Sequence, residues 1–291
     1  INGVLSYDSN GHFESLAVGE TATDSFTYTI SDGHGGTSTA TATMTITGEN
    51  DNPIAVSDVA AISENGAAIS VDLLSNDTDV DTSDTHTVSA IDATNTLGAV
   101  TLVNGVVTYS ANTAFESLAA GETATDSFTY TMSDGHGGTS TATATMTIMG
   151  ENDNPIAVAD AATISENGAA ITVDLLSNDT DVDTSDTHTV SAIDATGTLG
   201  AVTLNNGAVT YSANGAFESL AVGETATDSF TYTTSDGHGG TSTTTATMTI
   251  TGENDNPIAV ADAATISEDS SAVIDVLSND TDVDTSDTHT V

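Results

Sequence analysis

Four aspartates fall within eight residues in the run from Asp77 to Asp84, where Asp77, Asp79 and Asp81 alternate with single uncharged residues. The chain contains no lysine or arginine that could neutralise them. Two unit charges about 4 Å apart interact by roughly 1 kcal/mol in water and about 4 kcal/mol at an effective dielectric of about 20, so a fixed loop of bare carboxylates is costly. A divalent cation reverses the sign of this interaction. Hard oxygen ligands without histidine or cysteine favour Ca²⁺ over zinc or copper, and Mg²⁺ fits less well because it prefers a rigid octahedron.

The acidic run occurs three times because the chain is internally repeated. The string GENDNP ends at Pro53, Pro155 and Pro257, which are 102 residues apart. Solenoid units have roughly 20 to 50 residues, so a period of this length suits an independently folding domain. We predict that residues 1–52 are the C-terminal half of one repeat, that 53–154 and 155–256 are complete repeats, and that 257–291 begin a further repeat. The chain is then a fragment of something longer.

Each repeat shows the two-residue alternation of β-strands rather than a helical pattern. Between Thr141 and Ile148, apolar residues alternate with threonines, which predicts a half-buried strand. Phe128, Tyr130 and Met132 alternate in the same way, and the glycine-rich segment 133–138 joins the two strands as a hairpin. Further strands are predicted after Pro53 and over residues 69–73, 86–91, 100–103 and 106–109. About seven short antiparallel strands in about 100 residues predict an all-β fold, a tandem array of immunoglobulin-like β-sandwiches.

Strand counting predicts which acids meet. In an up-and-down sandwich, the loop of Asp77 to Asp84 and the hairpin at Asp134 lie at the end where the chain enters. Glu64, Glu116, Glu122 and Asp126 are expected in loops at the opposite end, beside the outgoing linker 151–155. Acids from the bottom of one repeat, the linker and the top of the next repeat should therefore converge at each junction, and calcium is expected there.

Other chemistry is poorly supported by the sequence. His86 and His136 lie among threonines, glycines and aspartates, without a pair at the spacing of a zinc site. The segment SDGHGG combines serine, histidine and aspartate but lacks the strand–turn–helix elbow of a hydrolase. Glu116 and Glu122 could in principle hydrolyse a glycoside, but that reaction usually needs an aromatic-lined cleft, and each repeat has few aromatic residues. We therefore expect no enzymatic activity.

Composition excludes several partners and structures. The 43 acidic residues give a formal net charge of −43, which opposes binding to nucleic acid and to anionic membrane surfaces. There is no cysteine, so disulfides and zinc–thiolate sites are excluded. No stretch approaches 18 consecutive apolar residues, and no signal peptide is recognisable, so membrane insertion by this fragment is not expected.

The run FTYTMSDGHGGTSTATATMTIMGENDNP resembles the end of a cadherin repeat, and Glu64 with Asp79 and Asp81 resembles the cadherin calcium ligands. The strings GETATDSFTYT, SDGHGG, GENDNP and NDTDVD are more closely similar to the VCBS and cadherin-like repeats of giant bacterial surface proteins, including RTX-type adhesins. The resemblance covers the whole chain and implies a secreted or cell-surface, calcium-rigidified extender that projects a distal binding domain. The Leu-Asp-Arg-Glu motif of cadherins is missing, which leaves open whether Glu116, Glu122 or Asp126 is a ligand.

These observations give one set of predicted calcium ligands, which comprises the acidic loops, the linkers, the hairpin aspartates and the glutamates at the far end of each repeat. The set is Asn50, Asp51, Asn52, Glu64, Asp77, Asp79, Asp81, Glu116, Asp134, Asn152, Asp153, Asn154, Glu166, Asp179, Asp181, Asp183, Glu218, Asp236, Asn254, Asp255, Asn256, Asp280, Asp282 and Asp284. The expected partners are calcium ions and neighbouring repeats of the same chain. An alternative is that the repeats themselves bind carbohydrate, or that their threonine-rich faces associate laterally into fibres.

Overall fold

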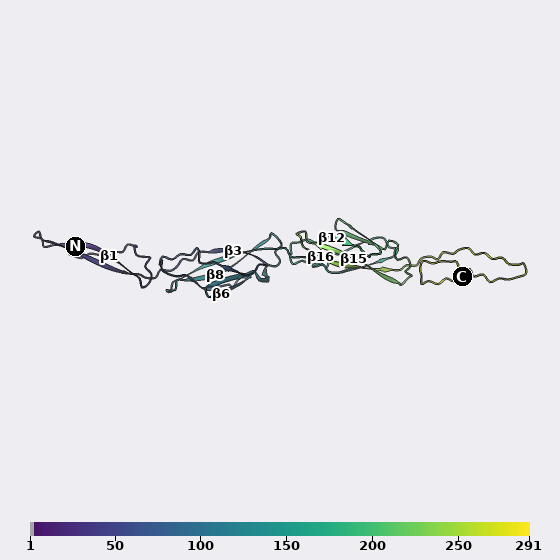
Figure 1. Cartoon of the computed structure of the whole chain (residues 1–291), viewed down its shortest axis with the longest axis horizontal. Coiled ribbons are helices and arrows are strands. Elements are labelled where there is room, and N and C mark those ends of the chain that lie inside the picture. The colour runs from purple at the N-terminus through teal and green to yellow at the C-terminus, as the bar shows by residue number, and fades with distance from the viewer. Residues whose placement is uncertain (1–2) are drawn as a thin grey trace. The chain divides into compact units, whose positions relative to one another are not determined.

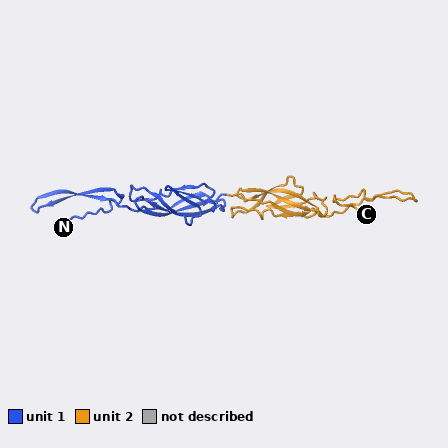
Figure 2. Ribbon diagram, turned by 90° about the horizontal axis from the view of Figure 1, so that it is seen from below, with its two compact units in different colours: residues 1–151 blue, residues 152–291 orange. Residues whose placement is uncertain are grey.

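The computed structural model describes residues 3–291, so the first two residues of the predicted segment 1–52 lie outside the described part. Strands β1 to β16 and one short 3₁₀ helix make up the regular structure of that part (Figure 1). The chain divides into two compact units, residues 1–151 (unit 1) and residues 152–291 (unit 2), which Figure 2 colours separately. The all-β fold class predicted from the sequence is confirmed.

Unit 1 contains a hairpin followed by a seven-stranded sandwich. The hairpin pairs β1 (Thr21–Ser31) with β2 (Thr37–Thr47). The sandwich has a four-stranded sheet of order β3-β9-β8-β5 and a three-stranded sheet of order β4-β7-β6. Its elements are β3 (Asp58–Ser63), β4 (Ile69–Val71), β5 (Thr87–Asp92), β6 (Ala99–Val103), β7 (Val106–Ser110), the 3₁₀ helix η1 (Asn112–Ala114), β8 (Thr123–Ser133) and β9 (Thr139–Met149).

Unit 2 repeats the same sandwich and continues into residues 257–291. Its sheets have the orders β10-β16-β15-β12 and β11-β14-β13. The strands are β10 (Asp160–Ser165), β11 (Ile171–Val173), β12 (Thr189–Asp194), β13 (Ala201–Asn205), β14 (Ala208–Ser212), β15 (Thr225–Ser235) and β16 (Thr241–Thr251). The segment 257–291 forms one isolated bridge, between Ile258 and Thr281.

The core follows from the alternation along β8 and β9. Tyr130, Met146 and Ile148 point inward and are at most 1% exposed, whereas the threonines between them face outward. Tyr109 of β7 comes from the other sheet and stacks against Phe128, with ring centroids 6.5 Å apart. Period-two patterning therefore assigns the two faces of each strand correctly.

The predicted strand directions are wrong in one respect. The sequence pattern predicts antiparallel strands in an up-and-down order, but β3 pairs with β9 in parallel, and β10 pairs with β16 in the same way. The hairpin β8–β9 leaves the outer edge of β9 unpaired, and the first strand of the sandwich occupies that edge. Alternation fixes which side chains are buried but not which strand fills a free edge, so the pattern could not reveal this pairing.

The sequence predicts Asp126 in a loop. In the structure it lies within β8 and is 7% exposed. Its carboxylate accepts hydrogen bonds from the amide of Gly98 and the hydroxyl of Tyr109, both at 2.8 Å, and from the amide of Leu97. Gly98 permits this approach, because a Cβ there would lie 2.4 Å from the Tyr109 oxygen. Asp126 thus anchors the turn before β6 to the core.

Asp228 plays the same part in unit 2, where it accepts from Gly200 at 2.8 Å and from the Tyr211 hydroxyl at 2.7 Å. Burial raises the pKa of Asp228, but the Gly200 amide, the Tyr211 hydroxyl and the Leu199 amide outweigh it, so the pKa is lowered. A carboxylate with a lowered folded-state pKa stabilises the fold above its unfolded pKa and loses this effect as the pH falls through the folded pKa.

We predict that Asp228→Asn destabilises unit 2 by about 2 to 3 kcal/mol at neutral pH, because charged hydrogen bonds to a buried acceptor are lost. The difference from the wild type should be complete above about pH 4 and should shrink at lower pH. Thermal unfolding of the 291-residue chain by calorimetry in EDTA measures both effects. Asp174→Asn, which removes the same charge from an exposed site, should change little; an equal loss in this control would refute the anchoring role.

Candidate metal-binding clusters

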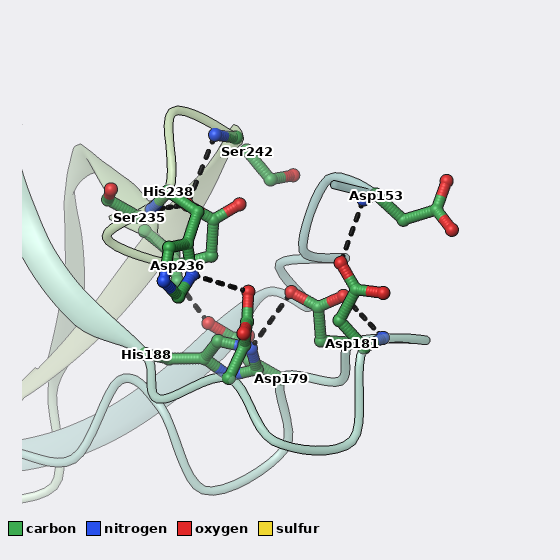
Figure 3. A network of polar contacts seen from close by, with 12 residues as sticks. Asp153, Asp179, Asp181, His188, Ser235, Asp236, His238 and Ser242 are labelled. Carbon is green, nitrogen blue, oxygen red and sulfur yellow. Dashed lines mark hydrogen bonds and ion pairs between the residues drawn. The ribbon is translucent and has the colours of Figure 1, made fainter. Parts of the chain in front are cut away.

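Three carboxylates meet beside the hairpin of each sandwich. In unit 2, Asp181 and Asp186 come from the loop between β11 and β12, and Asp236 comes from the turn between β15 and β16. One carboxylate oxygen of each lies within 4.8 Å of the others, and the same holds for Asp79, Asp84 and Asp134 in unit 1. We call these groups the hairpin clusters. Figure 3 shows the surroundings of the one in unit 2.

The turn between β15 and β16 fixes Asp236 in place. The Oδ1 atom of Asp236 accepts hydrogen bonds from the amides of His238, Gly239 and Gly240 at 2.7 to 3.1 Å. Gly239 has φ +114, a conformation that residues with a Cβ rarely adopt. Burial raises the pKa of Asp236, but Asn152 and the turn amides outweigh burial and lower it. The 2%-exposed carboxylate is therefore held in its charged form.

The linker reaches the hairpin cluster through Asn152. Its Nδ2 donates to Asp236 Oδ2 at 2.9 Å, and Asn50 makes the same bond to Asp134 in unit 1. A glycine at position 240 is needed here: a Cβ would lie 2.0 Å from Asp236 Oδ2 and 2.9 Å from Asn154 Oδ1. The structure thus brings the predicted linker residues together with the hairpin aspartate.

Two histidines flank the hairpin cluster and are its nearest basic groups. His238 Nδ1 lies 3.0 Å from Asp186 Oδ2, and His188 Nε2 lies 3.3 Å from Asp181 Oδ2. The hydrogen bond and the charge of Asp186 raise the pKa of His238. Asp186 Oδ1 is still buried without a hydrogen-bond partner. The histidines therefore satisfy only part of the acceptor capacity of the cluster.

A second kind of cluster forms in unit 2 from Glu166, Asp255 and Asp284, whose nearest carboxylate oxygens lie within 4.8 Å of one another. We call it the linker cluster. Glu166 follows β10, Asp255 belongs to the linker 252–256, and Asp284 belongs to the acidic loop of segment 257–291. The amide of Glu253 donates to Glu166 Oε1 at 2.6 Å, and the amide of Asp255 donates to Asp284 Oδ2 at 2.8 Å.

Each member of the linker cluster keeps one unsatisfied oxygen. Glu166 Oε2, Asp255 Oδ2 and Asp284 Oδ1 are all buried without a hydrogen-bond partner. Glu166 and Asp284 are only 3% and 1% exposed. Buried charges without partners are costly, and oxygen-only donor sets suit Ca²⁺. These residues fit a calcium ion as ligands, and such an ion would neutralise them and join three separate segments.

Several other predicted ligands lie outside the hairpin and linker clusters. Asp77, Asp179 and Asp280 lie outside the clusters and accept hydrogen bonds from the amides of Val56, Val158 and Val260. Glu116 and Glu218 also lie outside them, although their counterpart Glu14 lines a recess of about 260 Å³ with Asn50 and Asp51. Glu122 does not join a cluster either; it accepts from the amide of Ala119 in its own turn.

The remaining predicted ligands lie close to the clusters or at the surface. Asp81 and Asp183 are each 1% exposed and accept hydrogen bonds from the linker amides of Asp51 and Asp153. Asp282 accepts from the amide of Asp284, Glu64 accepts from the amide of Glu151, and Asn52, Asn254 and Asn256 are exposed.

Asp84 and its copy Asp186 belong to the hairpin clusters but are absent from the predicted set of ligands. They are the fourth carboxylates of the acidic runs, so the signal was present in the sequence. Asp84 and Asp186 lie three residues after the preceding aspartate, so the alternating pattern of the other acids did not include them.

The comparisons with known proteins agree with this architecture. The bacterial cadherin-like domain family matches residues 50–150 and 152–252, and the bacterial Ig domain family matches residues 1–45. The chain therefore belongs to the bacterial cadherin-like domain family. These are tandem adhesion-type repeats, typically extracellular and non-enzymatic. No curated protein matches the chain.

Solved cadherin structures are similar at low identity. Protocadherin gamma B2 extracellular cadherin domains 1–5 match at 16% identity and TM-score 0.46, over 86% of this chain and 50% of that chain. Protocadherin gamma B7 domains 1–4 match at 16% identity and TM-score 0.47, over 81% and 60%. Mouse clustered PcdhgC3 EC1-3 matches at 16% identity and TM-score 0.44, over 82% of this chain and 79% of that chain. The chain thus spans about half the length of the first of these proteins.

A membrane-crossing helix, which needs both length and apolar character, is not found among residues 3–291.

We predict that Gly240→Ala displaces Asp236 from its turn, because the added Cβ overlaps the Asp236 carboxylate. The amide protons of His238, Gly239 and Gly240 should then exchange faster with solvent, by about tenfold or more for a loss of about 1.4 kcal/mol of local hydrogen bonding. Amide hydrogen exchange followed by NMR measures this. Thr241→Ala, an exposed neighbour, is the matched control. Unchanged exchange in Gly240→Ala would contradict the close approach.

Proposed function

We propose that the chain is part of a calcium-rigidified extender of a bacterial cell-surface or secreted adhesin, of the VCBS and RTX type, that projects a distal binding domain. Residues 53–154 and 155–256 are its complete repeats, and residues 1–52 and 257–291 belong to adjoining ones. The cofactor is Ca²⁺, held by the hairpin clusters and the linker cluster.

The observation that carries this proposal is the set of three unsatisfied oxygens in the linker cluster, on Glu166, Asp255 and Asp284. No lysine or arginine exists in the chain to neutralise them. Without a cation, the three carboxylates repel one another in a poorly solvated site, and the repulsion favours separating the segments that carry them. With Ca²⁺ the same charges become attractive, so the ion converts the linker from a loose connection into a fixed one.

The origin of the ligands explains why the effect is rigidification rather than simple binding. Glu166 comes from the sandwich, Asp255 from the linker, and Asp284 from the loop that follows it. A single ion bound to all three restricts the linker at both of its ends. Extracellular calcium modules have dissociation constants of about 10⁻⁴ to 10⁻³ M, so such a linker stiffens after export into a calcium-rich medium.

Small-angle scattering of the 291-residue chain in millimolar Ca²⁺ and in EDTA tests the proposal. We expect the maximum dimension to decrease and the flexibility to increase on chelation, because the linkers lose their cross-links and gain repulsion. Glu166→Gln/Asp255→Asn/Asp284→Asn should reproduce part of this change even in calcium. Saturable association between chains, instead of a change within one chain, would favour a homophilic binding module.

The matched control replaces three exposed acids, Asp174→Asn, Glu268→Gln and Asp269→Asn, and removes the same charge. It should respond to calcium as the wild type does. If the wild type keeps one scattering profile with and without calcium, or if this control behaves like the linker-cluster variant, the extender proposal fails.

A further inference from the structure

A second group of carboxylates lies in unit 1 away from the clusters described above. Asp58, the first residue of β3, and Asp77, in the loop after β4, face the hydroxyl of Tyr130 in β8. Asp58 is 8% exposed, and its Oδ2 atom is buried without a hydrogen-bond partner.

One hydroxyl faces several acceptors at this place. The single Tyr130 hydroxyl proton faces the Val56 carbonyl oxygen at 3.1 Å and both Asp77 oxygens at 3.4 Å. Among the residues that the structure describes, the closest donor to Asp77 is the amide of Val56, at 2.7 Å from Oδ1. A hydroxyl can donate only one hydrogen bond, so Tyr130 cannot satisfy both carboxylates, and Asp58 Oδ2 is left buried without a partner.

Burial raises the pKa of Asp58, and the neighbouring charges of Asp77 and Asp72 add to this, while Tyr130 and Asn76 act in the opposite direction. These hydrogen bonds do not neutralise the two carboxylates, and with no lysine or arginine in the chain a metal cation would do so.

Unit 2 shows how the same position is satisfied when one more hydroxyl is present. The Tyr232 hydroxyl donates to Asp160 Oδ2 at 2.6 Å, and the Thr234 hydroxyl donates to Asp179 Oδ2 at 2.8 Å. Thr234 is completely buried. In unit 1 the corresponding residue is Met132, which has no hydrogen to donate to the carboxylate. The replacement of threonine by methionine therefore removes one donor from an otherwise equivalent site.

We propose that unit 1 binds a divalent cation, Ca²⁺, within the sandwich itself, through Asp58 Oδ2, the Asp77 carboxylate and the carbonyl oxygen of Val56. Two negative charges and oxygen donors match a hard divalent ion better than a monovalent one. The ion ties the segment before β3 and the loop after β4 to β8. This site is independent of the linker cluster and does not rest on the extender function.

Terbium luminescence offers a selective test, because Tb³⁺ replaces Ca²⁺ at oxygen sites and is excited through a nearby tyrosine. In the full chain, tyrosine-sensitised emission that Ca²⁺ competes away should come from the site beside Tyr130. Met132→Thr should weaken this terbium site by about tenfold or more, the usual effect of altering a neighbour of the ligands. Thr234→Met should add a second signal of similar size, from unit 2.

Two further measurements keep the outcomes distinct. The linker-cluster variant Glu166→Gln/Asp255→Asn/Asp284→Asn should keep the tyrosine-sensitised signal, so a failed extender function leaves this site testable. Circular dichroism should show that both position-132 and position-234 variants are folded. Unchanged emission in Met132→Thr would overturn the proposal, as would a carboxyl ¹³C signal of Asp58 that titrates as a free acid and does not respond to calcium.

Discussion

The absence of any lysine or arginine is the constraint on which the whole structure depends. Every buried carboxylate must find an amide, a hydroxyl, a histidine or a metal ion, since no permanent cation is available. Asp228 is satisfied by amides and the Tyr211 hydroxyl, and Asp236 by turn amides and Asn152. In the linker cluster, linker amides satisfy one oxygen of Glu166 and one of Asp284, but each of the three carboxylates keeps an oxygen without a partner. Its unsatisfied oxygens distinguish these three carboxylates from that of Asp228, whose oxygens are occupied by protein donors.

The two roles of the acids are kept apart by the sandwich. Its core consists of tyrosine, methionine and aliphatic side chains, and the acids of the clusters lie in loops, turns and linkers. Loss of a metal ion bound to these acids would therefore leave the core contacts of each sandwich in place and would remove the compensation of charge at the loops. Under the proposed function, calcium would therefore act on the loops and linkers without being required for the fold of every strand.

Much of this organisation can be predicted from the sequence. The alternation of apolar with polar residues predicts about seven strands, and the predicted ranges 100–103 and 106–109 correspond to β6 and β7, which Asn104 and Gly105 join in a tight turn. The joining of acidic loop, hairpin and linker was also expected, and the structure places Asp236 beside Asn152. Strand alternation reports burial and local turns, both of which are encoded within a few residues.

The rest depends on partners distant in the chain. The sequence predicts Asp126 in a loop. Its structural role follows only from the hydrogen bonds that Gly98 and Tyr109 donate to it in the folded chain. Asp77 belongs to the acidic run, but it accepts a hydrogen bond from the amide of Val56 and lies outside the hairpin cluster. Unit 1 has Met132 where unit 2 has Thr234, and either residue is compatible with a strand. The difference matters because the Thr234 hydroxyl donates a hydrogen bond to a buried aspartate and methionine cannot.

The parallel pairing of β3 with β9 has a consequence for a chain held at its two ends. The start of β3 follows the incoming linker and the end of β9 leads into the outgoing one, and these two points lie at opposite ends of the shared ladder. Tension between them is carried along the strands, so all six residue pairs from Asp58–Ala144 to Ser63–Met149 are loaded in shear together. Hydrogen bonds loaded in this way must break at once instead of unzipping in sequence, which gives each sandwich resistance to being pulled apart.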